Sequence, residues 1–442
     1  MSLKDSKAKA TPRLRFPEFR GGDGWNTARM TDLYSCMRNN ALSRDKLNYE
    51  HGTVKNIHYG GIHTKFSTLF DIGEERVPYI NATEEIPDAD SGDYCIEGDI
   101  ILADASEDMT DVGKSIEIIR LNNERLLSDQ HTILARPKDR TLTVGFGGHL
   151  FRSGQIRSQI QKEAQGTKVY AISATRLANI EIAYPSKKEE QQKIADCLGS
   201  LDELIIAQGK RVEALKSHKR GLMQELFPGE GETVPRLRFP EFREGAEWEE
   251  ALLDELARRG SGHTPNRGNA EYYDGGIKWV SLADSQRLDN GYIAQTAKEI
   301  SECGIEHSSA VLHAAGSVIL CRDASIGKCA ILMAPMAVSQ HFLVWTCDTA
   351  LLSNWFLYYY FQTMRPTFEQ VASGSTIKTI GLPFFKQLQI AKPSLREQQR
   401  IASCISSLDT LIAAEAEKLE ALKTHKKGLM QGLFPAMEEA TK

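Results

Sequence analysis

The sequence predicts two similar domains of mixed α/β (α+β) structure, separated by two long antiparallel coiled-coil helices, so that the molecule has a pseudo-two-fold axis. The string PRLRFPEFR occurs at 12–20 and again at 235–243. A second segment, at 190–228, recurs without a gap at 397–435, and more than half of its positions are identical. The stretches between these repeats are only weakly alike. The chain therefore repeats a framework and varies the domains that the framework holds.

The repeats also mark the boundaries, because 442 residues leave room for several separate cores. In chain order we expect a leader at 1–20, a first α/β domain at 21–184, a first long helix at 185–228, a linker with the repeated leader at 229–243, a second α/β domain at 244–392, a second long helix at 393–435 and a tail at 436–442.

The long helices are predicted from an apolar seam. Apolar residues recur at alternating spacings of four and three from Ile194 to Leu226, and again from Ile401 to Leu433. This 3.5-residue period is that of a coiled coil, and the most direct partner for each helix is the other one, in antiparallel pairing. The string LFP closes each segment, since proline cannot continue a helix.

The two intervening regions read as mixed domains that share one fold. β-Branched and aromatic runs between turn residues predict strands at 77–80, 99–103, 277–282, 317–321 and 341–345, with single helical stretches at 150–164 and 350–370. Three short strings recur in the same order: DIILADAS and SVILCRDAS, SDQHTIL and VSQHFLV, and QGTKVYAIS and SGSTIKTIG. A Gly-Lys pair also follows the first string in each domain.

Composition narrows the class of protein. A net charge of −5 argues against coating nucleic acid by bulk electrostatics, and indicates that a partner supplies part of any grip on phosphates. The eight cysteines form no Cys-x-x-Cys pair, and no apolar run is long enough to span a membrane. Without a secretory signal either, we expect a cytoplasmic protein that binds no metal and no membrane.

Catalytic motifs are missing from the sequence, so we expect a chain that is not an enzyme. Gly113-Lys114-Ser115 would need a glycine at position 108 to form a phosphate-binding P-loop, and that position is Asp108. The sequence contains neither the Glu-x-Lys string of restriction nucleases nor the Asn/Asp-Pro-Pro-aromatic string of adenine methyltransferases. We therefore expect no cofactor in this chain.

Together, the repeated elements resemble the specificity subunit of type I restriction–modification systems. The resemblance rests on EQQ-x-I-A at 190–195 and 397–402, the LFP ends, the LRFPEF leaders and the GHTPN…YYDGGIKWVS run at 262–281, and it covers nearly the whole chain. It implies two target recognition domains, each reading one half of a bipartite, asymmetric site in double-stranded DNA. It further implies that the helices set the gap and dock two methyltransferase (modification) subunits, which carry S-adenosylmethionine, and that translocase–nuclease (restriction) subunits join them.

Candidate DNA-binding residues are polar or basic side chains in glycine-bearing turns, where base edges and phosphates can be reached. They are Lys55, His58, Tyr59, His63, Lys65, Lys114, Gln130, Thr167 and Lys168 in the first domain, and Thr264, Asn266, Arg267, Arg322, Lys328, Gln340, Ser375, Thr376 and Lys378 in the second. Each has a structural alternative: the Gln-His pairs recur with the shared fold, and the Gly-Thr-Lys and Gly-Ser-Thr turns are also ordinary exposed hairpins. The rival hypothesis for the whole chain is a coiled-coil scaffold without sequence-specific DNA binding.

Overall fold

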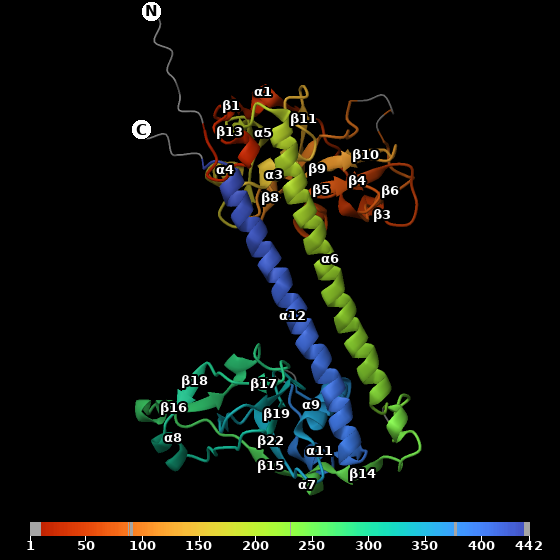
Figure 1. Ribbon diagram of the computed structural model, residues 1–442, viewed down its shortest axis with the longest axis vertical. Helices are drawn as coiled ribbons and strands as arrows, with labels where there is room; N and C mark the ends of the chain where they lie inside the picture. Colours follow the sequence, from red (N-terminus) through yellow and green to blue (C-terminus); the bar gives the residue numbers. More distant parts are fainter. Residues whose placement is uncertain (1–9, 87, 89–91, 230, 375–377, 437–442) are drawn as a thin grey trace, which may run out of the picture. The chain divides into compact units, whose positions relative to one another are not determined.

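The computed structural model describes residues 10–86, 88, 92–229, 231–374 and 378–436. The chain divides into two compact units: unit 1 holds Met1–Gly209 with Glu417–Lys442, and unit 2 holds Lys210–Ala416. Each unit therefore contains one α/β domain, the start of one long helix and the end of the other. The two helices, α6 (Lys188–Leu226) and α12 (Leu395–Leu433), can be followed by colour in Figure 1.

Each unit is built around a five-stranded sheet with the same strand order. In unit 1 the order is β2 (Tyr34–Met37), β11 (Thr132–Pro137), β7 (Ile100–Ala103), β9 (Ser115–Arg120), β5 (Leu69–Asp71); in unit 2 it is β15 (Ala257–Ser261), β22 (Phe342–Cys347), β19 (Val318–Cys321), β20 (Cys329–Leu332), β17 (Tyr292–Ile293). Neighbours are antiparallel except at the β5–β9 and β17–β20 edges, which are parallel. The shared order confirms two copies of one mixed fold.

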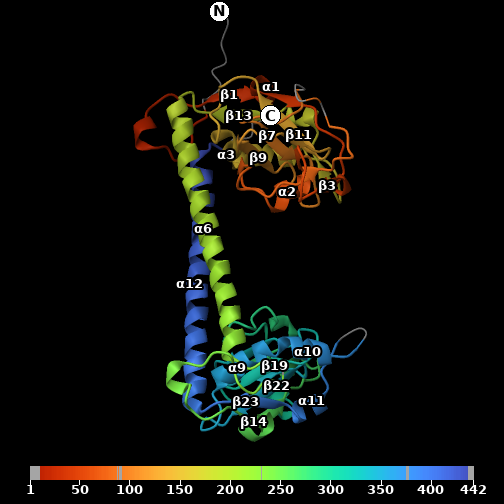
Figure 2. The ribbon, with the colours of Figure 1, turned by 90° about the vertical axis from the view of Figure 1, so that its right-hand side faces the viewer.

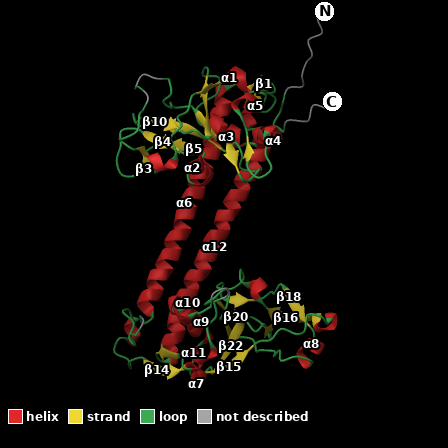
Figure 3. Ribbon diagram, turned by 180° about the vertical axis from the view of Figure 1, so that it is seen from behind, coloured by secondary structure: helices red, strands yellow, loops and turns green. Residues whose placement is uncertain are grey.

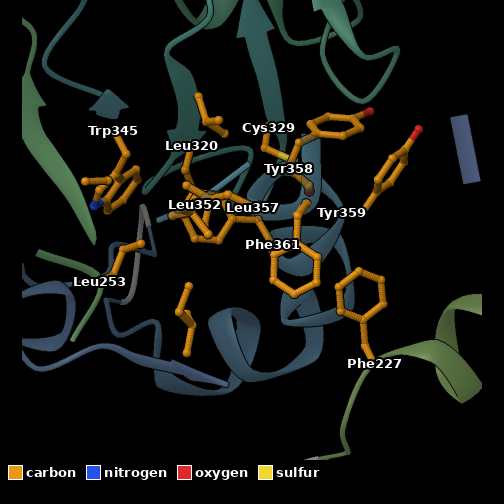
Figure 4. Close-up of a cluster of buried hydrophobic side chains, with 14 of the residues drawn as sticks. Phe227, Leu253, Leu320, Cys329, Trp345, Leu352, Leu357, Tyr358, Tyr359 and Phe361 are labelled. Atoms are coloured by element: carbon orange, nitrogen blue, oxygen red, sulfur yellow. Dashed lines mark hydrogen bonds between the residues drawn. The ribbon is translucent and has the colours of Figure 1, made fainter. Parts of the chain in front are cut away.

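The central strand of each sheet is buried on both faces, which explains its unbroken apolar sequence. In β19, Val318 and Leu320 point into one hydrophobic cluster, whereas Ile319 and Cys321 point into another. The same alternation holds in β7. Figure 4 shows Leu320 among the side chains of the larger cluster of unit 2.

Helices cover one face of each sheet. In unit 2, α9 (Asn354–Thr363) packs against β19 and β20 and is followed by α10 (Arg365–Val371) (Figure 3). Unit 1 has α3 (Phe146–Arg152) and α4 (Gly154–Glu163) in the corresponding place. The expected single helices at 150–164 and 350–370 are thus each two helices, which meet at Ser153 and at Met364.

Smaller sheets complete the units. Two-stranded sheets join β1 (Asn26–Arg29) to β13 (Glu181–Tyr184) and β14 (Glu249–Leu252) to β23 (Gln389–Lys392), the latter visible in Figure 2. Unit 1 adds the sheet β10 (Leu126–Ser128), β4 (Lys55–Ile57), β6 (Tyr79–Ile80), β3 (Leu47–Asn48) and the pair β8 (Ala105–Ser106), β12 (Tyr170–Ala171); unit 2 adds β18 (Lys298–Ile300), β16 (Tyr273–Val280), β21 (Ala337–Val338). The short helices are α1 (Met30–Leu33), α2 (Tyr59–Thr64), α5 (Ala174–Leu177), α7 (Leu253–Leu256), α8 (Glu302–Glu306) and α11 (Leu382–Lys386).

The long helices run antiparallel within each unit. In unit 2, Arg211 Nη2 lies 2.8 Å from Glu415 Oε1, and Lys219 Nζ, two turns further along α6, lies 2.6 Å from Asp409 Oδ1, earlier in α12. The predicted seam is also seen in the burial pattern, since Leu201, Gln208 and Val212 are buried while Glu203, Ile206 and Lys210 between them are exposed. Period and pairing therefore agree with the sequence prediction.

The repeated leader fastens the two helices together in each unit. In unit 1 the guanidinium of Arg15 donates two hydrogen bonds of 2.6 Å to the carboxylate of Glu190 at the start of α6, and Leu14 N donates to Gly432 O at the end of α12. In unit 2, Arg238 binds Glu397 in the same way, and Leu237 N donates to Glu225 O. We call these two contacts, the Arg–Glu ion pair and the backbone hydrogen bond, the leader clasp. The leader sequence is repeated because both helix junctions need the same contacts.

The glutamine after each of these glutamates fastens the helix to the α/β domain. Gln191 accepts a 2.8 Å hydrogen bond from Thr143 N, and Gln398 accepts one of the same length from Ser353 N. Both side chains are buried, so their polar atoms need these partners. The EQQ string therefore joins helix, leader and domain, which accounts for its repetition.

Candidate nucleic-acid interface

Several of the candidate DNA-binding residues lie at one end of each five-stranded sheet. Strand register places the end of β19 next to the start of β22, because Cys321 pairs with Phe342, and β20 begins on the other side of β19. The end of β15 reaches the same edge, since Ser261 pairs with Leu343. We call this edge, with its connecting loops, the loop end of the sheet.

In unit 2 the loop end brings together two predicted residues from separate strings. Thr264 Oγ1 donates a hydrogen bond to Gln340 Oε1, although 76 positions separate them in the chain. Gly262 makes the approach possible, since a Cβ there would lie 2.1 Å from Val338 O. Gln340 remains exposed at this edge, with its Nε2 3.5 Å from His341 Nε2.

A histidine–aspartate pair stands beside that glutamine. His341 Nδ1 lies 2.7 Å from Asp323 Oδ1, and Asp323 is in the loop that leaves β19. The counterparts in unit 1 are His131 and Asp104, 3.7 Å apart. The recurring strings DAS and QH are therefore the two sides of one contact, which sequence comparison alone did not reveal.

A hairpin lies over this histidine–aspartate contact, and it carries the third pair of recurring strings, QGTKVYAIS in unit 1 and SGSTIKTIG in unit 2. In unit 2, Asp323 pairs with Thr379 and Ser373 pairs with Thr379 across the hairpin; in unit 1, Gln165 pairs with Ala171. Thr167 and Lys168 are exposed at the tip of the unit 1 hairpin, and Lys378 is exposed in unit 2. The predicted residues Ser375 and Thr376 lie outside the described residues.

The two Gly-Lys lysines make internal contacts of the same kind. Lys114 Nζ donates a 2.8 Å hydrogen bond to His63 O, and Lys328 Nζ donates one of 2.9 Å to Ser285 O. Each lysine thereby ties the hairpin after the central strand to the neighbouring segment, while part of its side chain stays accessible. These contacts give a structural reason for the recurrence of the Gly-Lys pair in both domains.

The remaining predicted DNA-binding residues of unit 2 differ in their exposure to solvent. Asn266 and Arg267 are exposed in the turn after Thr264, and Asn266 Oδ1 accepts a hydrogen bond from Gly268 N. Arg322 is partly enclosed, and its Nε is buried without a hydrogen-bond partner.

The segment 55–65 of unit 1 is less open than a loop. Lys55 lies in β4, with its Nζ 2.7 Å from Glu124 Oε2. His58 caps α2 by accepting a hydrogen bond from Gly60 N, and Tyr59 packs between the rings of His58 and His131. His63 contacts Ala105 O, and Lys65 donates to the hydroxyl of Tyr49. This segment therefore joins the loop end of unit 1 through Tyr59 and His63, whereas Lys55 is taken up in an ion pair.

Burial sets the protonation of the groups in this cluster. It lowers the pKa of His58, which favours the neutral ring that accepts from Gly60 N. It also raises the pKa of Asp129 to about 6, against the opposing effect of the His131 and Tyr59 backbone N–H groups, and raises that of Asp104. These carboxyl groups of unit 1 therefore take up protons at a higher pH than exposed aspartates do.

The described residues contain no cluster of metal ligands and no membrane-spanning helix. Among them, no group of three His, Cys, Asp or Glu side chains is arranged to hold a metal ion. In the same part of the chain, no helix combines the length and apolar character needed to cross a bilayer.

Sequence reasoning missed three sets of residues. The Asp104 and Asp323 partners of the histidines were visible only as part of a recurring string. Arg365, on α10, lies beside the Gly327-Lys328 turn, and its Nη2 donates to Gly327 O at 3.4 Å. The clasp arginines Arg15 and Arg238 were seen as repeats without a partner, although a repeated arginine and a repeated glutamate were a usable signal.

Comparison with known proteins gives one family. The family model described as "Type I restriction modification DNA specificity domain" matches twice, at residues 22–217 and 245–424. A protein of Methanocaldococcus jannaschii named "Putative type I restriction enzyme MjaX specificity subunit" is 22% identical over 98% of this chain and 96% of its own length. The MjaIX specificity subunit of the same organism is 28% identical over 40% of this chain and 41% of its own.

Solved structures show the same fold. The type I restriction–modification S subunit from M. genitalium matches with a TM-score of 0.57 and 15% identity, covering 97% of this chain and all of that one. A chain from a study of complex assembly in the type I restriction–modification system matches with a TM-score of 0.56 and 16% identity, covering 96% and 99%. Together with the two family-model matches, which cover most of the sequence, these findings show that the chain belongs to the type I restriction–modification specificity subunits, the non-catalytic components that carry DNA specificity.

Proposed function

We propose that this chain reads a bipartite, asymmetric site in double-stranded DNA, with one α/β domain for each half-site. The observation that carries the proposal is the recurrence of the loop end in both units, with one architecture and different exposed side chains. Unit 1 presents Gln130, Thr167 and Lys168 there, and unit 2 presents Gln340, Asn266 and Arg267. Side chains with amide and guanidinium groups are those that pair with base edges in the major groove. Because the two sets differ, the two half-sites should differ.

The long helices are proposed to set the gap between the half-sites. Each helix has 39 residues, which makes it about 58 Å long at 1.5 Å per residue. That length corresponds to about 17 base pairs at 3.4 Å each, enough for two half-sites about one helical turn of DNA apart. A coiled coil is stiff enough for this role because its two helices support each other along the seam.

The helices are also proposed to dock two copies of a methyltransferase subunit. Leu204 on α6 and Leu411 on α12 occupy equivalent positions of the repeat, and both side chains are exposed, at 57% and 39%. An exposed leucine on a helix whose seam is already packed is available to a partner. Two equivalent surfaces on one chain match two copies of the same partner.

The chemistry would then belong to the partners. The methyltransferase subunits would bind S-adenosylmethionine and methylate the DNA, and translocase–nuclease subunits would join for restriction. The solved structure that is described in terms of complex assembly supports partner subunits in general. This chain would position the DNA through hydrogen bonds and ion pairs, and its own residues would form no covalent bond with it.

The test is the pattern of DNA methylation in the host, read by long-read sequencing, with the gene intact and deleted. Loss of one bipartite methylated motif on deletion, and its return on complementation, is the expected result. Complementation with a chain carrying Gln340→Ala and Arg267→Ala should alter one half of the motif and leave the other unchanged. A deletion that leaves every methylated motif in place, in a host that transcribes the partner genes, would favour the scaffold instead.

A further inference from the structure

Unit 2 contains a basic pocket next to its loop end. The pocket has a volume of about 580 Å³ and is lined by Ala324, Ser325, Ile326, Lys328, Arg365, Glu369 and Lys378. These residues come from three places: the hairpin loop between β19 and β20, the helix α10, and the hairpin that ends at Thr379. Three of the side chains are cationic and one is anionic, so the pocket favours an anion.

Arg365 is the central group of this pocket. Its Nη2 lies 2.8 Å from Asp289 Oδ1 and 3.4 Å from Gly327 O, contacts that hold the guanidinium against the turn. Its Nε is buried and has no hydrogen-bond partner. A planar guanidinium fixed in this way in the lining of the pocket is suited to an oxygen-rich anion.

The lysines on either side of Arg365 strengthen the preference of the pocket for an anion. Lys328 is held by Ser285 O, so its charge is fixed beside the pocket, whereas Lys378 is exposed on the hairpin. The hydroxyl-bearing Ser325 also lines the pocket. The base-reading candidates Gln340 and Thr264 lie at the same sheet edge, because Asp323 of the pocket loop contacts His341.

The corresponding place in unit 1 is built differently. The loop between the equivalent strands is longer, 104–114 against 322–328, and the guanidinium of Arg157 donates a 2.8 Å hydrogen bond to Thr110 O inside it. Burial lowers the pKa of Arg157 to about 10. A Cβ at Gly113 would lie 2.7 Å from Ile160 Cγ2, which shows how closely the helix packs on the turn. The shorter loop of unit 2 leaves Arg365 facing a pocket instead.

We propose that this pocket holds one phosphate group of the DNA backbone beside the half-site that unit 2 reads, with Arg365, Lys328 and Lys378 as its ligands. This inference rests on the proposed function and assigns a phosphate contact within it. Phosphate contacts fix the position of a reader on the duplex without selecting sequence. Glu369, four residues after Arg365 on α10, is the unfavourable group in the pocket, and its charge weakens the contact.

The test measures binding of a mixed-sequence duplex to the full chain, purified from its host with the subunits that accompany it, over a series of salt concentrations. Arg365→Gln and Lys378→Gln should each weaken binding and reduce the slope of log K against log salt by about 1. Glu369→Gln should act in the opposite direction and strengthen binding. Because a merely destabilised protein cannot bind more tightly, the opposite signs separate a phosphate contact from loss of folding.

Arg258→Gln is the matched control. Arg258 is exposed on β15 but lies toward the other end of the sheet, since it pairs with Thr346, so its neutralisation should leave the slope unchanged.

Unaltered slopes in the Arg365 and Lys378 variants, with wild-type DNA binding intact, would overturn the pocket assignment alone. Inorganic phosphate binding that depends on Arg365, with DNA affinity independent of it, would also overturn it in favour of a free-anion site. A wild-type complex that binds no duplex would remove the proposed function and the pocket assignment together.

Discussion

Lys219 Nζ lies 2.6 Å from Asp409 Oδ1, and this ion pair between the long helices is repeated in unit 1 as Lys426 and Asp202, at 2.5 Å. The lysines interrupt the apolar seam at equivalent positions of the two helices. In unit 2 the hydroxyl of Tyr359 also donates to Asp409 Oδ2, at 2.9 Å. The duplicated sequence thus produces a duplicated contact, but the α/β domains complete it differently.

This difference between the two units identifies His149, in unit 1, as a position where a substitution can raise stability. His149 follows Phe146 by three residues as Tyr359 follows Phe356, and both phenylalanines pack on the tryptophan after the leader. His149 is buried with both ring nitrogens lacking partners, Asp202 Oδ2 is also buried and unpaired, and burial lowers the pKa of His149 to about 3.

We therefore expect His149→Tyr to raise the free energy of unfolding of unit 1 by about 1 kcal/mol, because the hydroxyl would satisfy Asp202 as Tyr359 satisfies Asp409. Thermal unfolding checks this, with His149→Phe as the control that adds the ring without the hydroxyl. Equal stability of the Tyr and Phe variants would show that no new hydrogen bond forms.

Breaking the leader clasp should destabilise one unit. Arg238→Ala leaves Glu397 buried without its ion-pair partner, which typically costs about 3 kcal/mol or more. Differential scanning calorimetry should show a lower transition temperature. The matched control is Lys423→Ala, which removes an exposed pair with Glu420 and should change stability by less than about 0.5 kcal/mol. Similar losses in both variants would contradict the clasp.

A fragment comprising residues 1–228 should dimerise. The core of unit 1 includes Leu433 and Phe434 from the end of the second long helix, and the fragment lacks them. Their repeat equivalents, Leu226 and Phe227, are present and can enter the same place in a second copy. Sedimentation should therefore show a dimer, with Phe227→Asp as the control that keeps the chain monomeric. A well-folded monomer would rule out exchange of the helix end.

Glu117 should make unit 1 less stable as the pH rises. Burial raises its pKa from 4.5 to about 8, against the effect of hydrogen bonds from Gly145 N and Gly148 N. Between these values the folded chain retains a proton that the unfolded chain has lost, so the free energy of unfolding falls with increasing pH. Glu117→Gln should flatten this dependence between pH 5 and pH 8, measured by denaturant unfolding across that window. An unchanged slope would mean that other groups set it.

Lengthening both long helices by about one turn, about four residues each, should alter the target without altering its halves. The gap between half-sites should grow by about one or two base pairs, because one turn adds about 5.4 Å. Methylome sequencing of a host that carries the insertions reads the gap and both halves at once. A change in either half-site sequence would contradict a spacing role for the helices.

The sequence by itself determined the repeated framework, the approximate length of the helices and the seam along which they pair, and the class of the α/β domains. It did so because these properties depend on periodic or local patterns: the 3.5-residue seam from Ile194 to Leu226, the proline that ends each helix, and the short β-branched runs. It also placed Gln130, Gln340, Lys114 and Lys328 in recurring strings, which the fold brings to the loop ends.

Only the tertiary structure decided what those residues contact. The pairs His341–Asp323 and Thr264–Gln340, and the two clasps, join positions 18 to 175 residues apart, and no local pattern specifies which of many polar groups will meet. It also decided that Lys55 is held in an ion pair and that Arg365, absent from every recurring string, faces a pocket. Side-chain contacts of this kind depend on loop length and on packing across the sheet, which become fixed only when distant segments come together.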